Sequence, residues 1–143
     1  MSDRIVVIGS CNTDMVINTD RLPLPGETII GGNFFMNAGG KGANQAYAAG
    51  KLGGSVSMIG AVADDSFGKM LTDNLEKVGV NTAGIAVMEG ETTGQAFITV
   101  DGAGANSIIL IGGTNAKVSR ELIDENRALI EECDILMMQL EID

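Results

Sequence analysis

The sequence predicts an α/β protein with a parallel sheet flanked by helices and a second, smaller sheet attached to it. Short aliphatic and β-branched runs alternate with segments of helical spacing, which is the pattern of a parallel sheet covered by helices. Two other strand-rich segments, about 15–36 and 95–111, contain turn signals and no helix. The 143 residues, 45% of them hydrophobic, are enough for one ordinary domain.

The first half of the chain alternates strands and helices. Residues 4–8 form an apolar run that ends at a Gly-Ser pair, as expected of a buried central strand. An Ala-rich helix over 43–52 ends at a pair of glycines, and residues 65–78 carry apolar side chains at helical spacing before Gly79. The other strands expected in this half, two of them separated by a Gly-Gly bend, are residues 14–18, 28–30, 34–36 and 56–59.

The second half begins with a hairpin and ends with a strand. Residues 95–100 and 107–111 flank a turn-rich segment and predict the hairpin. A helix is expected over 119–133, with Ser119 as its N-cap, and a buried strand over 135–140. About three strands of the main sheet are recognisable, fewer than the five or six of an average sheet, and no helix follows the last. We therefore expect an incomplete core and a chain that is part of a longer protein.

The composition limits the chemistry and the partners. The chain has no His, which excludes His-dependent nucleophiles and imidazole metal sites, so a general base would be a carboxylate, Lys, Tyr or a thiolate. A net charge of −10 and an aromatic content of 3% argue against nucleic acid and anionic membrane surfaces as partners. Cys11 and Cys133 have no metal-binding spacing and are expected to be buried thiols. With no signal-peptide pattern and no apolar run near the roughly 18 residues of a membrane helix, we expect a cytoplasmic protein. Because the chain has no His and no metal-binding cysteine spacing, we expect no metal site in it.

Asn12 and Asp14 lie just past the end of the first predicted strand, where ligands of open α/β sheets bind. A carboxylate accepts hydrogen bonds from hydroxyl groups, and an amide both donates and accepts, which suits the orientation of a polyol. The alternative is a capped strand end or an Asx turn.

A glycine-rich segment, residues 37–44, leads into the Ala-rich helix. Its glycines allow the backbone to approach a ligand closely, and the N-terminus of the helix adds amide donors. The segment fits neither a phosphate P-loop nor the dinucleotide-binding pattern. It suits hydroxyls or a single anionic group, with Lys41 and Asn44 as side-chain donors, and the alternative is a tight strand-to-helix turn.

Two acidic features near predicted strand or helix ends have different interpretations. Glu141 follows the last strand and is placed like Asn12 and Asp14, although a frayed acidic terminus is the alternative. Asp64 and Asp65 could suggest a cation site, but acidic capping of the following helix explains them more simply.

Together these motifs resemble the ribokinase-like family of carbohydrate kinases. They occur in the family's order and extend over almost the whole chain, and the glycine-rich segment is the most specific of them. One departure is Ala63, where family members commonly have Gly before the acidic pair. The matching segments are Gly9-Ser10-x-Asn12-x-Asp14, Arg21-x-Pro23-x-x-Gly26-Glu27-Thr28, residues 37–46, Asp64-Asp65-Ser66-Phe67-Gly68 and Met138-Gln139-Leu140-Glu141.

The resemblance implies a Rossmann-like fold with a small β-sheet lid, of which residues 1–143 would be the N-terminal, sugar-binding part. The implied reaction is the ATP-dependent phosphorylation of D-ribose to ribose 5-phosphate, with Mg²⁺ and a monovalent cation such as K⁺. The lid segments, about 15–36 and 95–111, would close over the sugar and pair with the lid of a second subunit in a homodimer.

The resemblance also implies roles for particular residues. Asn12 and Asp14 would bind sugar hydroxyls, and Glu141 would bind the sugar near the transferred phosphate. The sugar-side wall would be formed by Gly39, Gly40, Lys41 and Asn44, and the lid residues that shield the ligand from water would be Ala96, Phe97 and Ile108.

The family's catalytic base has no counterpart that we recognise. It is an Asp in a Gly-Ala-Gly-Asp-like segment, whereas here Gly102-Ala103-Gly104 is followed by Ala105 and lies in the predicted hairpin turn. We therefore expect no catalytic residue in this chain and expect the base to lie beyond Asp143, in an absent C-terminal half with the ATP, Mg²⁺ and K⁺ sites. The chain would be inactive alone. The alternatives are another sugar or nucleoside kinase of the family, a sugar-binding regulatory module, or an interaction domain built on the lid.

Overall fold

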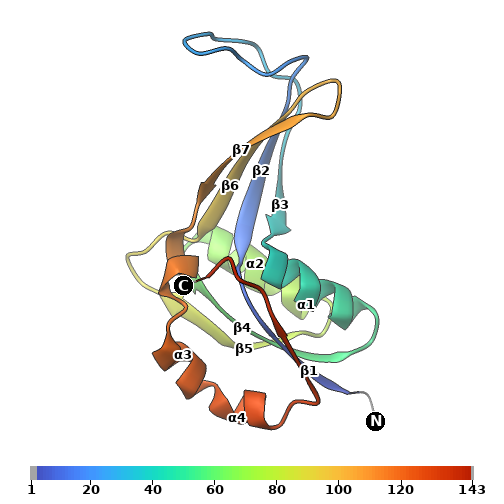
Figure 1. Cartoon of the computed structure of the whole chain (residues 1–143), viewed down its shortest axis with the longest axis vertical. Coiled ribbons are helices and arrows are strands. Elements are labelled where there is room, and N and C mark those ends of the chain that lie inside the picture. Colours follow the sequence, from blue (N-terminus) through green and yellow to red (C-terminus); the bar gives the residue numbers. More distant parts are fainter. Residues whose placement is uncertain (1–2, 143) are drawn as a thin grey trace.

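The computed structural model describes residues 3–142 and contains two four-stranded sheets, the second of which projects away from the first (Figure 1). The first sheet is parallel throughout. In the second sheet the two central strands, β2 and β6, are parallel, and each outer strand is antiparallel to its neighbour. The first sheet has the order β5 (Asn81–Met88), β4 (Ser55–Ala63), β1 (Arg4–Ile8), β8 (Ile135–Met138), and the second has the order β3 (Phe34–Gly39), β2 (Asn12–Asn18), β6 (Gly94–Val100), β7 (Asn106–Ile111).

The catalytic base is expected to lie beyond Asp143. Asp143 lies outside the described residues, as does everything that would follow it. The position of the base therefore stays a prediction.

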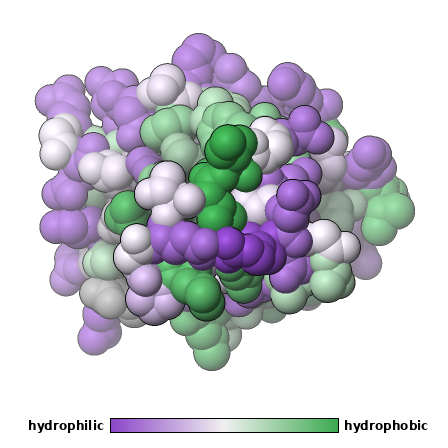
Figure 2. Space-filling model, turned by 90° about the horizontal axis from the view of Figure 1, so that it is seen from above, coloured by the Kyte–Doolittle hydropathy of each residue, from purple (hydrophilic) through white to green (hydrophobic). Residues whose placement is uncertain are grey.

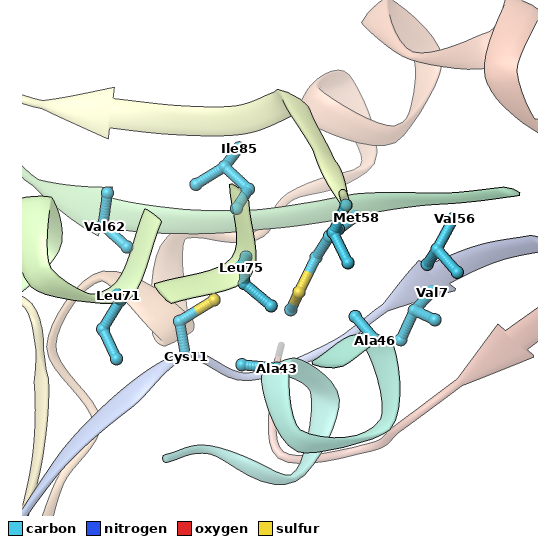
Figure 3. Close-up of a cluster of buried hydrophobic side chains, with 11 residues drawn as sticks. Val7, Cys11, Ala43, Ala46, Val56, Met58, Val62, Leu71, Leu75 and Ile85 are labelled. Carbon is cyan, nitrogen blue, oxygen red and sulfur yellow. The ribbon is translucent and has the colours of Figure 1, made fainter. Parts of the chain in front are cut away.

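Helices cover both faces of the first sheet. Successive residues of β1 point to opposite faces, so that Val7 packs toward the first pair of helices and Val6 and Ile8 toward the second group. Figure 3 shows the first of these clusters, with Met58 beside Leu75. The helices are α1 (Lys41–Lys51) and α2 (Ser66–Glu76) on one face, and α3 (Arg120–Glu125) and α4 (Arg127–Glu131) on the other, while the 3₁₀ helix η1 (Gly113–Lys117) contacts β4.

Several local predictions are confirmed by hydrogen bonds. Asp65 is the N-cap of α2, and its carboxylate accepts the backbone N–H of Gly68 at 2.7 Å. Ser119 caps α3 through the N–H of Leu122. The hairpin turn between β6 and β7 is closed by Asp101, whose carboxylate accepts the N–H groups of its neighbours two and four residues on. No helix follows this turn before residue 113.

Two expected elements differ in the structure. The strand predicted at 28–30 is absent, because these residues lie in the long loop between β2 and β3 without a partner strand, and Ile30 is 95% exposed. The helix predicted over 119–133 is interrupted at Asn126, which separates α3 from α4. The Asn126 side chain donates to the carbonyl oxygen of Leu122 at 2.9 Å and so takes the acceptor that a continuous helix would give to its backbone N–H.

The expected burial of the last strand is wrong, and one strand was not predicted. β8 forms an edge of the first sheet, and Ile135, Leu136 and Met138 remain exposed because no strand pairs with its outer side within residues 3–142. β5 was missed at the other edge, where it pairs with β4. Within the described residues, no helix is long and apolar enough to cross a membrane.

Both cysteines are free thiols. Cys11 is fully buried in the cluster of Figure 3, and this burial raises the pKa of its thiol to about 12. Cys133 is only partly buried, which differs from the expectation, and its thiol donates to the carbonyl oxygen of Ile130.

Candidate functional site

The start of β2 places two polar side chains at the junction of the two sheets. The chain leaves the carboxyl end of β1, turns through Ser10 and Cys11, and enters the second sheet at Asn12. Asn12 and Asp14 are two residues apart on one strand and therefore share a face. Asn12 is buried, whereas Asp14 is partly open to solvent. Burial raises the pKa of the Asp14 carboxyl above its usual range.

The glycines before α1 make room for these two residues. Gly39 pairs with Asn12 across β2 and β3, and a Cβ at this position would overlap the Asp14 carboxylate. Gly40 has φ +91°, a conformation that favours glycine, and a Cβ there would lie 2.6 Å from the backbone nitrogen of Asn12. The segment is therefore a tight strand-to-helix turn, and it also brings the start of α1 directly against Asn12 and Asp14.

Lys41 and Glu141 join α1 to the residues that follow β8. Their side chains form an ion pair, and the hydroxyl of Ser10 donates to the other carboxylate oxygen of Glu141 at 3.5 Å. The backbone N–H of Ser10 is bound in turn by the side chain of Gln139 at 3.1 Å. Glu141 is thus held beside the end of β1 and is not a frayed terminal residue.

These side chains surround one pocket of about 210 Å³. Its polar side is formed by Asn12, Asp14, Lys41, Asn44 and Glu141, and its apolar side by residues of β6 and β7. The predicted site residues in its lining are Asn12, Asp14, Gly40, Lys41, Asn44, Ala96, Ile108 and Glu141.

Two predicted residues do not line the pocket, and two others do. Gly39 supports it from behind by leaving space for Asp14. Phe97 lies between Ala96 and Ile98 in β6, and alternation places it on the opposite face of the sheet. Ile98 and Leu110 line the pocket and were missed. The two-residue period of the predicted hairpin was the signal that could have found them.

The polar side chains of this pocket do not fit a nucleoside triphosphate with its metal ion. Lys41 is the one basic residue in the lining, and it is paired with Glu141. No group of three or more Cys, Asp or Glu side chains able to hold a metal ion occurs within residues 3–142. The arrangement instead offers carboxylate acceptors and amide and ammonium donors beside an apolar wall, which suits an uncharged ligand rich in hydroxyl groups.

Comparisons with known proteins agree with this arrangement. The family model described as pfkB family carbohydrate kinase matches residues 2–140. A ribokinase from Haemophilus influenzae is 40% identical over 99% of this chain, and one from Schizosaccharomyces pombe is 43% identical over 96% of it. The solved structure of Arabidopsis thaliana ribokinase complexed with ribose and ATP is similar over 100% of this chain, with a TM-score of 0.89 and 35% identity.

The matches extend over nearly all of this chain but not over all of the other proteins. The chain covers 46% of the Haemophilus protein, 45% of the Schizosaccharomyces protein and 47% of the Arabidopsis chain. It therefore spans about half the length of the curated relatives that it matches. Since the family model accounts for residues 2–140, the chain belongs to the pfkB family of carbohydrate kinases.

Proposed function

We propose that this chain is the sugar-binding part of a kinase that transfers a phosphoryl group from ATP to D-ribose. The observation that carries the proposal is the convergence of Asn12, Asp14, Lys41, Asn44 and Glu141 on one pocket with an apolar wall. The similarity to a ribokinase whose structure is a complex with ribose and ATP supports the choice of sugar and of phosphoryl donor.

Asp14 is the principal sugar ligand in this proposal. No protein group within residues 3–142 donates a hydrogen bond to its carboxylate, so both oxygens can accept from ligand hydroxyls. Partial burial strengthens such bonds, because the carboxylate competes with less water than at an open surface. Asn44 and Lys41 supply donors at the N-terminus of α1, and Glu141 accepts on the side nearest β8.

The second sheet acts in this proposal as a lid over the sugar. Its lid segments, about 15–36 and 95–111, include Ala96, Ile98, Ile108 and Leu110, whose side chains form the apolar wall of the pocket. An apolar cover favours transfer of the phosphoryl group to a sugar hydroxyl, because it excludes water as a competing acceptor. The small side chain of Ala96 leaves room for the sugar directly opposite Asp14.

We assign the catalytic base and the ATP, Mg²⁺ and K⁺ sites to residues beyond Asp143, outside this chain. The length of the relatives that this chain does not cover is large enough to contain them. The Gly102-Ala103-Gly104 segment lies in the tip of the β6–β7 hairpin, which is unsuited to a helix-capping anion site. The chain alone is therefore expected to bind sugar without phosphorylating it.

A second copy of the chain is the proposed partner of the lid, in a cytoplasmic homodimer. The face of the second sheet opposite the pocket carries Met36, Phe97 and Ile109, all exposed. Figure 2 looks down on the end of the molecule at which the second sheet projects, and exposed apolar side chains lie among hydrophilic ones there. Light scattering during size-exclusion chromatography should give a dimer mass, and Ile109→Lys should give a monomer. A monomeric wild-type chain would contradict this part of the proposal.

The direct test measures sugar binding and turnover separately. Calorimetric titration should show D-ribose binding, and Asp14→Asn should weaken it about tenfold or more, as expected for loss of hydrogen bonds to a charged group. The matched control is Asp64→Asn, which removes an exposed carboxylate outside this pocket. 2-Deoxyribose, fructose and adenosine, titrated in parallel, test the alternative substrates, and tighter binding of one of them would replace D-ribose in the proposal.

Turnover is measured as ADP release with D-ribose, ATP, Mg²⁺ and K⁺, with a full-length ribokinase as positive control. We expect none from this chain. Clear turnover that Asp14→Asn abolishes would place the base and the ATP site within these 143 residues and overturn that assignment. Absence of binding to every sugar tested would reject the sugar-binding role of the chain.

A further inference from the structure

We propose that Asn115 is a positioning residue that fixes the orientation of the Asn12 amide and so makes the pocket end of Asn12 a hydrogen-bond donor. Asn115 lies in η1, more than 100 residues from Asn12 in the sequence, and is 3% exposed. The part of this inference that concerns the ligand rests on the proposed function.

Asn115 makes three hydrogen bonds to Cys11 and Asn12, where the chain passes from β1 to β2. Its Oδ1 accepts the backbone N–H of Cys11 at 2.8 Å. Its Nδ2 donates to the carbonyl oxygen of Cys11 at 3.0 Å and to Oδ1 of Asn12 at 2.7 Å. The side-chain amide of Asn115 is thus fully engaged with residues 11 and 12.

The backbone of Cys11 determines which way both amides point. A backbone N–H can only donate and a backbone carbonyl can only accept, so the Asn115 amide has one orientation that satisfies both. In that orientation its Nδ2 faces Asn12, and the Asn12 side chain must present its oxygen in return. The Nδ2 of Asn12 is then directed away from Asn115. The N–H and carbonyl of Cys11 therefore determine, through the side-chain amides of Asn115 and Asn12, which atom of Asn12 faces the pocket.

The surroundings of Asn12 support this direction. Asn12 lines the pocket, and no acceptor among residues 3–142 is hydrogen-bonded to its Nδ2. This atom is also not fully buried, so it is open to a ligand or to water. Gly94 is the register partner of Asn12 in β6, and a Cβ there would overlap both Asn12 Oδ1 and Asn115 Nδ2. The glycine therefore leaves the space in which the two amides meet.

The consequence is a defined donor beside a defined acceptor. Asn12 donates into the pocket and Asp14, on the same strand face, accepts. A ligand must then offer an acceptor to the first and a donor to the second. Hydroxyl groups do both, whereas a ligand carboxylate could satisfy Asn12 but would be repelled by Asp14. Asn115 therefore contributes to the selection of a polyol without touching it.

The key variant is Asn115→Asp, which has nearly the same shape but presents only acceptors when ionised. The Asn12 amide should turn over and donate to the introduced carboxylate, so that its oxygen faces the pocket. D-Ribose affinity should fall by up to about tenfold, because the hydroxyl that accepted from Asn12 must turn to donate to its oxygen and so gives up the acceptor that it had before. Asn115→Ala, which frees the Asn12 amide to rotate, should weaken binding less and serves if the first variant does not fold.

The matched control is Thr114→Val in the same short helix. It removes the buried hydrogen bond from Thr114 Oγ1 to the carbonyl oxygen of Ala61 at 3.0 Å without touching Asn12. Its thermal midpoint should fall while D-ribose affinity stays unchanged. Equal loss of affinity in Thr114→Val and Asn115→Asp would show that Asn115 is merely structural and would overturn the inference.

A spectroscopic readout separates this inference from the proposed function. In the wild-type chain the Asn12 Nδ2 hydrogens face the pocket and should exchange rapidly with water. In Asn115→Asp they should exchange more slowly, because they donate into the interior. If the wild-type chain binds no sugar, the proposed function fails and this exchange measurement alone decides the orientation. Unchanged exchange in the variant would overturn the inference whatever the sugar result.

Discussion

The two sheets of this chain contain similar aliphatic strands but bury them very differently. In β1 the run Val6-Val7-Ile8 is almost completely buried, whereas every residue of β7, with its run Ile108–Ile111, is exposed. The difference does not lie in strand composition. It lies in what covers each sheet, because helices lie on both faces of the first and on neither face of the second along most of its length (Figure 1).

The comparison separates two uses of apolar side chains. In the first sheet they stabilise the fold, since their burial removes hydrocarbon from water within this chain. In the second sheet most of that gain is not realised within residues 3–142. Exposed apolar surface of this kind marks a binding or interaction site, which agrees with its proposed use as a lid and as a contact with a second copy.

The largest expected difference is therefore in stability. Leu75→Ala, in the α1–α2 side of the core (Figure 3), should lower the free energy of unfolding by about 3 kcal/mol, because a buried leucine leaves a cavity. Ile109→Ala, in the second sheet, should lower it by less than about 0.5 kcal/mol, because Ile109 is 69% exposed. Urea denaturation measures both.

An equal loss in the two variants would break the comparison. It would mean that the second sheet is packed against something in solution, with self-association as the first explanation to test. Repeating the Ile109→Ala measurement over a range of protein concentrations distinguishes this, because stability that comes from association rises with concentration.

A smaller effect distinguishes two partly buried carboxylates, one in each region. Burial alone would raise the pKa of Asp65, but hydrogen bonds from Gly68 and from the hydroxyl and N–H of Thr93 outweigh it and hold that pKa below its usual range. Asp65→Ala should therefore cost about 1 kcal/mol of unfolding free energy at neutral pH. Asp14→Asn should leave the midpoint unchanged or raised, because the Asp14 carboxylate has no such donors and its pKa is raised.

The pH dependence of stability gives the same contrast with opposite signs. The contribution of Asp65 is present above the pKa of an unfolded Asp, about 3.9, and is lost as the pH falls through its lower folded value. The Asp14 carboxylate disfavours folding above its raised pKa, and protonation relieves this as the pH falls. Urea midpoints of the two variants against wild type between neutral and acid pH measure both. A midpoint lowered by Asp14→Asn at neutral pH would show that Asp14 is part of a structural turn.

Local signals in the sequence predicted most helices and strands of the first region and the polar residues proposed to line the pocket. Caps such as Asp65 and Ser119 act within a few residues of the chain, so their patterns predict helix starts. Likewise, the ends of parallel strands gather at one edge of a sheet, which is why Asn12, Asp14 and Glu141 could be expected near one another. The pocket contains all three.

The remaining features depend on contacts between distant segments. β5 begins with polar and small residues and forms a strand through its pairing with β4 across a bulge. Asn115 acquires its role through hydrogen bonds to residues more than 100 positions earlier, and no spacing rule predicts them. The interruption at Asn126 reflects a side chain that competes with its own helix, which apolar spacing does not reveal.

The finest distinction concerns the pH at which the pocket stops binding sugar. Asp14 accepts hydroxyl hydrogens at both oxygens only as a carboxylate, since protonation turns one oxygen into a donor, and burial raises its pKa. D-Ribose affinity should therefore be constant near neutral pH and fall as the pH is lowered through that raised value. An ordinary exposed Asp, with a pKa of about 3.9, would delay the loss to more acid conditions.

Titrations at a series of pH values, with a parallel series on Asp14→Asn, isolate the contribution of the Asp14 carboxylate. The variant should bind weakly, with little change over the same range. A wild-type affinity that stays constant until the protein unfolds would mean that the Asp14 carboxylate is not the acceptor, and the polar side of the pocket would then have to bind sugar through Asn12, Asn44 and Glu141 instead.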